Sequence, residues 1–425
     1  MNRQFYPQLN ESVFQGTLPN GLSIVVAPRP GFEKKLCYLA VDYGSIHSDF
    51  VMDGVMVHAP SGVAHYLEHK LFDMPGRDIS EEFAALGASV NAFTSYDMTA
   101  YYFTCTEHFD NCLRLLLEFV TTPYFTEESV AKEQGIIGQE IDMNLDSPDT
   151  QVFENLARAM YRNHPVRKPI LGTRDSISRI TPQVLEACHR AFYRPGNLLL
   201  CVVGDVDPEA VYQVALACTG SDAGPQVQPT RRWPEEMTVQ ESFVSTRMDV
   251  AMPTFQLGFK CEPLGWGEEA VHREIVGDLA AETLFGESSP LYLRLYEQGL
   301  IDSSFGGGYD TIEGMSMLSV FGDSDDPQAI LDAILDQAKS IAAQGIRQED
   351  FLRMKRSAIG RRIKGLDSFD STCFRICAYH FSGFDYFRFP SVYETVTAED
   401  ILAFIRQTVT PERACLSVIY PNEED

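Results

Sequence analysis

The chain has 425 residues, of which 44% are hydrophobic, and a net charge of −26. This length allows about two or three domains, and the negative charge excludes nucleic acid as the main partner, because phosphates would be repelled. No run approaches the roughly 18 apolar residues of a membrane span, and residues 1–16 do not resemble a secretory signal. The ten cysteines have no paired spacing. They indicate buried free thiols in a reducing compartment, so we expect a cytoplasmic protein that does not bind membranes.

Short β-type runs and amphipathic helical patterns follow one another through the first half of the chain. Strands are predicted near 22–28, 37–44, 90–95, 99–105 and 198–204, and helices near 61–73, 78–86, 107–121, 126–144 and 181–193. Two consecutive helices after hairpin-like strands favour an α+β layer over alternating βαβ units. We therefore predict the α+β fold class.

The predicted helix at 61–73 carries two histidines four residues apart, His65 and His69, with Glu68 between them. Positions i, i+3 and i+4 share one helix face, so both imidazoles can chelate one metal ion while the carboxylate reaches a bound water. Zinc in hydrolytic sites takes three protein ligands and lowers the pKa of bound water to about 7. Ser61 is the expected N-cap of this helix.

A third ligand is expected from the predicted helix at 126–144. Glu133 and Glu140 are seven residues apart and therefore lie on one face of that helix. Glu140 has isoleucines around it, where a carboxylate is costly unless it is paired or bound to metal. Glu133 could instead be exposed, or could accept a hydrogen bond from a ligating imidazole.

Together, His65, Glu68, His69, Glu133 and Glu140 resemble the inverted zinc-binding motif of the pitrilysin or insulinase-type peptidases. The resemblance continues along nearly the whole chain. Its further segments are 18–26, 41–45, 91–95, 99–102, 193–197 and 202–205. The resemblance implies two related domains per chain, each an antiparallel sheet packed with helices, which together form half of a clamshell.

The resemblance also assigns roles to individual residues. It implies zinc ligands at His65, His69 and Glu140, a general base at Glu68 and a supporting residue at Glu133. It implies that an extended peptide pairs with an edge strand that contains Asn91, Ala92, Phe93 and Thr94. Two histidines and one carboxylate suit zinc best, although manganese or cobalt could substitute.

The second half of the chain repeats the first without its ligands. A polar, loop-rich linker at 219–242 separates a zinc-bearing domain, 1–218, from a related domain, 243–425. Two alignments support the repeat. The shared Leu-Asp-Ser triplets place Arg361 where Glu140 stands, and the Leu-Phe pairs place Asp278, Ala281 and Glu282 at the three motif positions. The second domain is therefore expected to be structural or substrate-binding.

One segment departs from the family pattern. Family members complete the site with an arginine and a tyrosine from a second-half domain. Here Leu295 or Tyr296 stands at the arginine position and Asp302 at the tyrosine position, although Arg294 could substitute. We expect a homodimer, or a heterodimer with a related chain that supplies the missing pair. The expected function is zinc endopeptidase action on short or unfolded peptides in a closed chamber. A specific leader-peptide maturation protease and a non-catalytic assembly subunit are the alternatives.

Overall fold

The computed structural model describes residues 1–221 and 224–423. They form two compact units, and each unit includes a segment from the other half of the sequence. Unit 1 consists of Met1–Ile141, Pro169–Thr230 and Ile363–Arg388, and unit 2 of Asp142–Lys168, Arg231–Arg362 and the described part of Phe389–Asp425. The predicted repeats therefore divide the sequence differently from the compact units.

Unit 1 contains a seven-stranded sheet in the order β1-β2-β3-β11-β4-β10-β9. Only β3 and β11 pair in parallel, and all other neighbours in this sheet are antiparallel. Its strands are β1 Asn2–Tyr6, β2 Glu11–Thr17, β3 Ser23–Pro28, β4 Lys35–Val41, β9 Ser89–Thr94, β10 Thr99–Cys105 and β11 Leu198–Gly204. Two smaller sheets pair β5 Asp49–Met52 with β6 Val55–His58 and β12 Val227–Pro229, and β7 Asp73–Met74 with β8 Arg77–Asp78.

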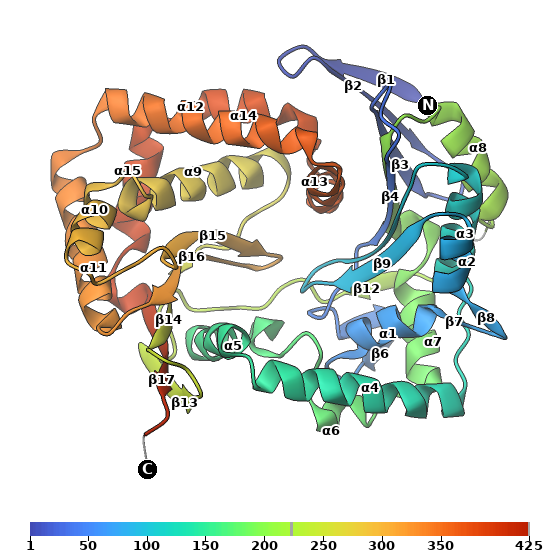
Figure 1. The fold of residues 1–425 in the computed structure, drawn as a ribbon, viewed down its shortest axis with the longest axis horizontal. Coiled ribbons are helices and arrows are strands. Elements are labelled where there is room, and N and C mark those ends of the chain that lie inside the picture. Colours follow the sequence, from blue (N-terminus) through green and yellow to red (C-terminus); the bar gives the residue numbers. More distant parts are fainter. Residues whose placement is uncertain (222–223, 424–425) are drawn as a thin grey trace. The chain divides into compact units, whose positions relative to one another are not determined.

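Helices cover both faces of the unit 1 sheet (Figure 1). They are α1 Val63–Leu71, α2 Ile79–Ala85, α3 Phe109–Thr121, α4 Glu127–Leu145, α6 Arg174–Ile177, α7 Pro182–Phe192, α8 Pro208–Cys218 and α13 Phe369–Phe381. On one face, alternate strand residues such as Leu39, Phe103 and Leu200 form a fully buried core with side chains of α1, α2, α3, α7 and α8. Helix α13 packs against β4 and β11, where Cys201 contacts Cys373 and Cys377. Glu140 and the α1 histidines are thus placed on helices that a large apolar core holds in position.

Unit 2 contains a five-stranded sheet in the order β13-β17-β14-β16-β15. Its strands are β13 Phe243–Met248, β14 Thr254–Cys261, β15 Gly306–Ile312, β16 Met315–Asp323 and β17 Ala414–Pro421. Its helices are α5 Pro148–Met160, α9 Gly267–Phe285, α10 Pro290–Glu297, α11 Pro327–Gln344, α12 Gln348–Lys364, α14 Phe389–Thr395 and α15 Ala398–Thr408. Short 3₁₀ turns of the two units are Pro165–Arg167, Pro195–Asn197, Gly365–Asp367, Tyr386–Arg388 and Pro411–Arg413.

The two sheets share one topology. In chain order, β3, β4, β9, β10 and β11 occupy the same positions as β13, β14, β15, β16 and β17, including the parallel pair β13 and β17. The predicted α+β class with two related sheets is confirmed. Each sheet is mixed rather than purely antiparallel, because the last of these five shared strands lies parallel to the first of them and antiparallel to the second.

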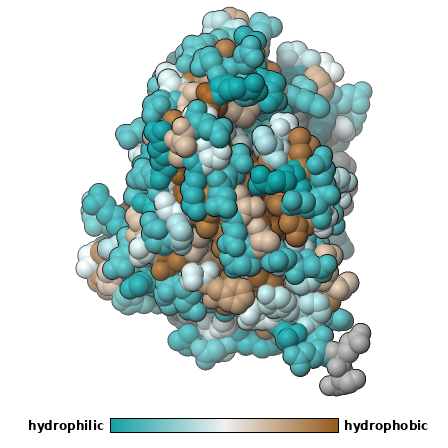
Figure 2. Space-filling model, turned by 90° about the vertical axis from the view of Figure 1, so that its left-hand side faces the viewer, coloured by the Kyte–Doolittle hydropathy of each residue, from teal (hydrophilic) through white to brown (hydrophobic). Residues whose placement is uncertain are grey.

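Hydrophilic residues cover most of the face in Figure 2, with smaller groups of hydrophobic residues between them. Among the described residues, no helix is both long enough and apolar enough to cross a membrane. The cysteines are free thiols, and all but the partly exposed Cys218 are buried.

Candidate metal centre

Helix α1 carries the paired histidines, and its sequence explains its position. Val63, Ala64, Leu67 and Leu71 are buried and recur at helical spacing, so one face of α1 packs into the unit 1 core. The Tyr66 hydroxyl donates a hydrogen bond to the Val130 carbonyl of α4. The core and this bond fix α1 against α4.

The predicted N-cap at Ser61 is wrong. The cap residue is Gly62, in the left-handed conformation with φ of 93°, and no side chain caps the helix. A Cβ at Gly62 would lie 2.3 Å from the Leu171 carbonyl oxygen, because the chain there packs directly against the loop at Gly172. Glycine is needed for both the positive φ and this close approach.

Helix α4 presents the carboxylates. Val130, Ile137 and Ile141 are buried on its inner side, while Glu133 and Glu140 lie two turns apart. A Cβ at Gly138 would lie 2.6 Å from a guanidinium nitrogen of Arg174, so a larger residue there would displace the end of that arginine side chain.

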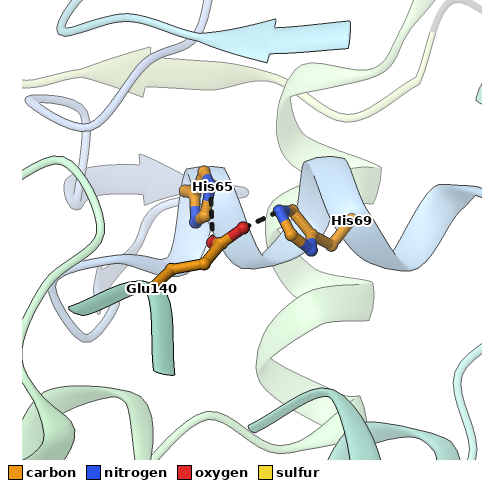
Figure 3. A group of neighbouring side chains, drawn as sticks. All are labelled: His65, His69 and Glu140. Carbon is orange, nitrogen blue, oxygen red and sulfur yellow. Dashed lines mark ion pairs between the residues drawn. The ribbon is translucent and has the colours of Figure 1, made fainter. Parts of the chain in front are cut away.

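Three predicted ligands converge on one point (Figure 3). Oε2 of Glu140 lies 3.6 Å from Nε2 of His65 and 3.7 Å from Nε2 of His69. One donor atom from each of the three residues lies within 4.8 Å of the others, and no other cluster of this kind occurs in the described ranges. Tetrahedral ligands at about 2.1 Å from one zinc ion are roughly 3.4 Å apart. The spacing therefore suits a single small cation.

Glu133 fixes the orientation of His69. Nδ1 of His69 lies 3.0 Å from Oε1 of Glu133, and because a carboxylate only accepts, Nδ1 carries the proton. The lone pair of Nε2 then remains available on the side of Glu140. The supporting role predicted for Glu133, in which a carboxylate holds a ligating imidazole in the required tautomer, would use this contact.

Glu68 is buried beside the three ligands. Burial raises its pKa, a change opposed by a hydrogen bond from the Thr94 hydroxyl and by His69. The Thr94 Oγ1 to Glu68 Oε2 distance is 2.6 Å. A buried carboxylate with a raised pKa is well suited to accept a proton and release it again.

The two histidines have opposite pKa shifts. Burial and the nearby His69 lower the pKa of His65 to about 3. Burial would also lower the pKa of His69, but the hydrogen bond to Glu133 and the carboxylates of Glu140 and Glu68 raise it overall. His65 is therefore neutral and ready to ligate at neutral pH, whereas protons compete more strongly for His69.

Strand β9 forms one edge of the described unit 1 sheet, as predicted for the substrate-binding strand. Its side chains alternate between the two faces. Phe93 packs near Phe374 of α13, with ring centroids 5.9 Å apart, whereas Ala92 packs against the core that contains α1. The Asn91 side chain accepts a hydrogen bond from the Ala92 backbone N–H. The Thr94 hydroxyl donates a hydrogen bond to Glu68 rather than facing solvent. The free edge leaves backbone groups available for another strand.

Two family models match this chain. The model described as insulinase (peptidase family M16) matches residues 37–174, and the model described as peptidase M16 inactive domain matches residues 179–358. YmfH of Bacillus subtilis, described as an uncharacterized zinc protease, is 36% identical over 98% of this chain and 98% of its own length. The chain belongs to the insulinase family, M16.

Solved structures of M16 proteins agree with this assignment. An M16-like peptidase from Alicyclobacillus acidocaldarius matches with a TM-score of 0.93 and 31% identity, covering 97% of this chain and 99% of its own. Pitrilysin shares the fold, with a TM-score of 0.77 and 18% identity over 99% of this chain and 46% of the pitrilysin chain. This M16 chain thus spans about half the length of pitrilysin.

The donor set of this M16 chain fits zinc. Oε2 of Glu140 is buried and has no hydrogen-bond partner within the described parts of the chain, and the same holds for Nδ1 of His65. An unpaired buried carboxylate oxygen is costly. A cation between Glu140 and the two imidazoles would remove this cost for Glu140.

The segment that departs from the family pattern lies in unit 2, at the end of α10. Leu295 is buried in the core of that unit, whereas Arg294 and Tyr296 are exposed. Asp302 caps a turn by accepting a hydrogen bond from the Ser304 backbone at 2.7 Å. Neither Leu295 nor Asp302 carries the chemistry of the expected arginine and tyrosine.

The sequence did not predict the close contact of Gly62 with the loop at Gly172 or the hydrogen bond from the Thr94 hydroxyl to Glu68. The local sequence does not show why these positions require glycine. The start of α1 at Gly62 contacts Leu171 and Gly172, which lie more than a hundred residues further along the chain. Thr94 was expected to bind substrate. Only the three-dimensional pairing of β9 with α1 shows that its side chain is directed to Glu68.

Proposed function

We propose that this M16 chain is a zinc-dependent endopeptidase that cleaves short or unfolded peptides. The observation that carries the proposal is the convergence of Nε2 of His65, Nε2 of His69 and Oε2 of Glu140 beside the buried carboxylate of Glu68. The relatives described as zinc proteases support it.

The residues of this chain would divide the work as follows. His65, His69 and Glu140 hold zinc, and Glu133 keeps His69 in the ligating tautomer. When bound, zinc would supply Lewis-acid polarisation of water and of the scissile carbonyl. Glu68 accepts a proton from the attacking water and passes it to the leaving amine nitrogen.

Substrate binding would use the free edge of β9 at Asn91, Ala92 and Phe93. Backbone pairing recognises any extended segment, so folded proteins should resist cleavage and flexible peptides should not. The free thiols support a reducing, cytoplasmic location.

We also propose that the active form is a dimer. The chain is about half as long as pitrilysin, and Leu295, Tyr296 and Asp302 do not provide an arginine and tyrosine pair. A related chain that retains this pair would complete the site as a heterodimer. Robust peptide cleavage by the pure homodimer would rule out that requirement.

The deciding experiment is the metal content of the purified chain, wild type beside His65→Ala, measured by elemental mass spectrometry. We expect about one zinc per wild-type chain and none in His65→Ala. If neither protein binds zinc when it is supplied, the metal-centre proposal fails and a non-catalytic assembly role becomes the better explanation.

Glu68→Gln separates catalysis from metal binding. We expect zinc to be retained and cleavage to fall by about 10²–10⁴-fold, because the amide cannot accept the proton. Mapping the products from a mixed peptide pool then separates the two enzymatic alternatives. Many cut sites indicate general peptide degradation, and a single cut site indicates leader-peptide maturation.

A further inference from the structure

Thr94 connects the edge strand to Glu68. It is the last residue of β9 and lies on the same face of the strand as Val90 and Ala92, which pack against the core that contains α1. Its Oγ1 donates a hydrogen bond of 2.6 Å to Oε2 of Glu68. No other hydrogen bond from the described residues reaches this carboxylate, so Oε1 remains available.

The backbone at Thr94 is held by a tight hairpin turn. The Ser95 N–H donates to the Met98 carbonyl at 2.7 Å, and Thr94 pairs with Thr99 across the two strands. The turn is clamped from outside as well. The backbone N–H groups of Ser45 and Ile46 donate to the carbonyls of Ser95 and Tyr96, at 3.1 and 2.9 Å.

Close packing adds to this clamp. A Cβ at Gly44 would lie 2.5 Å from the backbone of Tyr96 and Asp97, so the turn and the strand end after β4 are in direct contact. Threonine is β-branched and has few χ1 rotamers. The hydroxyl of Thr94 is therefore offered to Glu68 from a rigid support.

We propose that Thr94 is a positioning residue, whose hydroxyl holds Oε2 of Glu68 so that Oε1 is the oxygen that accepts the proton of water. This inference rests on the proposed function. The Thr94 proton stays on its own oxygen throughout. One proton moves from water to Oε1 of Glu68 as the water oxygen bonds to the carbonyl carbon, and then moves on to the amine nitrogen as the C–N bond breaks.

The position of Thr94 also couples the base to the substrate strand. Asn91, Ala92 and Phe93 immediately precede it on β9. A peptide paired with these residues and the carboxylate of Glu68 are thus aligned by the same rigid strand. Small displacements of a reacting group cost much of the rate, up to about 100-fold for 1 Å.

The test compares Thr94→Val, Thr94→Ser and Thr104→Val. Valine removes the hydroxyl and keeps the branched shape, serine keeps the hydroxyl, and Thr104 lies at the other end of the same hairpin, away from Glu68. Steady-state cleavage of a quenched fluorescent peptide, chosen from the mapped products, gives kcat and KM. Zinc content and the unfolding temperature are measured on the same samples.

We expect Thr94→Val to lower kcat by about 10- to 100-fold, with KM within about twofold and with one zinc retained. Thr94→Ser and Thr104→Val should keep kcat within about threefold of the wild type. A merely structural role would lower the unfolding temperature without this selective loss of kcat. Equal kcat values for Thr94→Val and Thr104→Val would overturn the proposal.

Crystal structures of wild type, Thr94→Val and Thr94→Ser provide a readout that does not need turnover. We expect the Glu68 carboxylate to leave its position, or to occupy several, only in Thr94→Val. An unchanged Glu68 in Thr94→Val would refute the positioning role even if the enzyme were inactive. Absence of zinc from the wild type would instead refute the proposed function, so the two failures are distinguishable.

Discussion

The candidate metal centre of unit 1 has a counterpart in unit 2, and the comparison shows what the predicted ligands contribute. Because the two sheets share one topology, α9 corresponds to α1 and α12 corresponds to α4. In this correspondence Glu282 replaces His69 and Arg361 replaces Glu140. The structure places those two side chains in an ion pair, with 3.1 Å between the Arg361 guanidinium and Oε2 of Glu282.

Equivalent pairs of helices, α1 with α4 and α9 with α12, therefore bring side chains together in both units, but the charges of these side chains differ. In unit 2 the cation is the guanidinium of Arg361, which neutralises Glu282 directly. In unit 1 the carboxylate of Glu140 faces two imidazoles and has a buried oxygen without a hydrogen-bond partner among the described residues. The fold brings the positions together, and the residue types decide whether an external cation is needed.

The supporting residues differ in the same way. The position of Glu133 is taken by Met354, whose sulfur lies 3.6 Å from the Thr283 hydroxyl, and the position of Glu68 is taken by the buried Ala281. At these two positions unit 2 therefore has neither an acceptor that could orient an imidazole nor a carboxylate that could serve as a base. These replacements agree with the match of residues 179–358, which include both positions, to the inactive-domain model.

The largest expected effect comes from converting one centre into the other. In His69→Glu combined with Glu140→Arg, unit 1 acquires the pair found in unit 2, which should form an ion pair and exclude zinc. We expect zinc content to fall from about one per chain to none, with all cleavage lost and the fold retained. Elemental mass spectrometry and circular dichroism check this, and zinc retained by the double variant would contradict the assigned ligands.

A smaller loss of zinc affinity should follow from replacing Glu133, the hydrogen-bond partner of His69, with an uncharged residue. Glu133→Gln keeps the size of the side chain but weakens the hydrogen bond that fixes the tautomer. We expect zinc affinity to fall by about 10- to 100-fold. Competition with a chromogenic chelator measures it, with Glu127→Gln, at the start of the same helix, as the matched control. Equal affinities of the two variants would mean that Glu133 does not support the site.

The pH dependence of zinc binding should reflect one histidine rather than two. Since the pKa of His65 is lowered to about 3, it is already neutral in the working range, whereas the raised pKa of His69 lets protons compete with zinc for this side chain at a higher pH. As pH falls below the pKa of His69, affinity should decrease about tenfold per pH unit. In Glu133→Gln, the pH at which zinc affinity begins to fall should be lower. A hundredfold loss per unit would show that both histidines bind protons there.

Much of this site could be predicted from the sequence because its signals are local. The spacing of His65, Glu68 and His69 fits one helix face, and the seven-residue spacing of Glu133 and Glu140 fits another. The element boundaries near these residues were also close, as in α4, predicted at 126–144 and found at Glu127–Leu145.

What could not be predicted depends on contacts between distant segments. Ser61 has the right chemistry for an N-cap, but the approach of the loop at Gly172 places Gly62 there instead. Nor does the local pattern show that α13 packs on the sheet of unit 1 and α5 on that of unit 2. Such placements are set by tertiary packing, which overrides local preference.

The smallest expected effect tests the ion pair of unit 2 itself. Arg361→Glu would place a carboxylate against Glu282, but the Arg361 side chain is 58% exposed, so solvent screens the repulsion. We expect the free energy of unfolding to fall by about 1 kcal/mol, measured by urea denaturation with Arg361→Gln as the control. Zinc should remain at about one per chain, because unit 2 would then offer Asp278, Glu282 and a glutamate without any imidazole, and zinc in hydrolytic sites is held by histidines. A second tightly bound zinc in Arg361→Glu would show that carboxylates on two contacting helices are enough to bind zinc. The histidines of unit 1 would then not be what distinguishes the two centres.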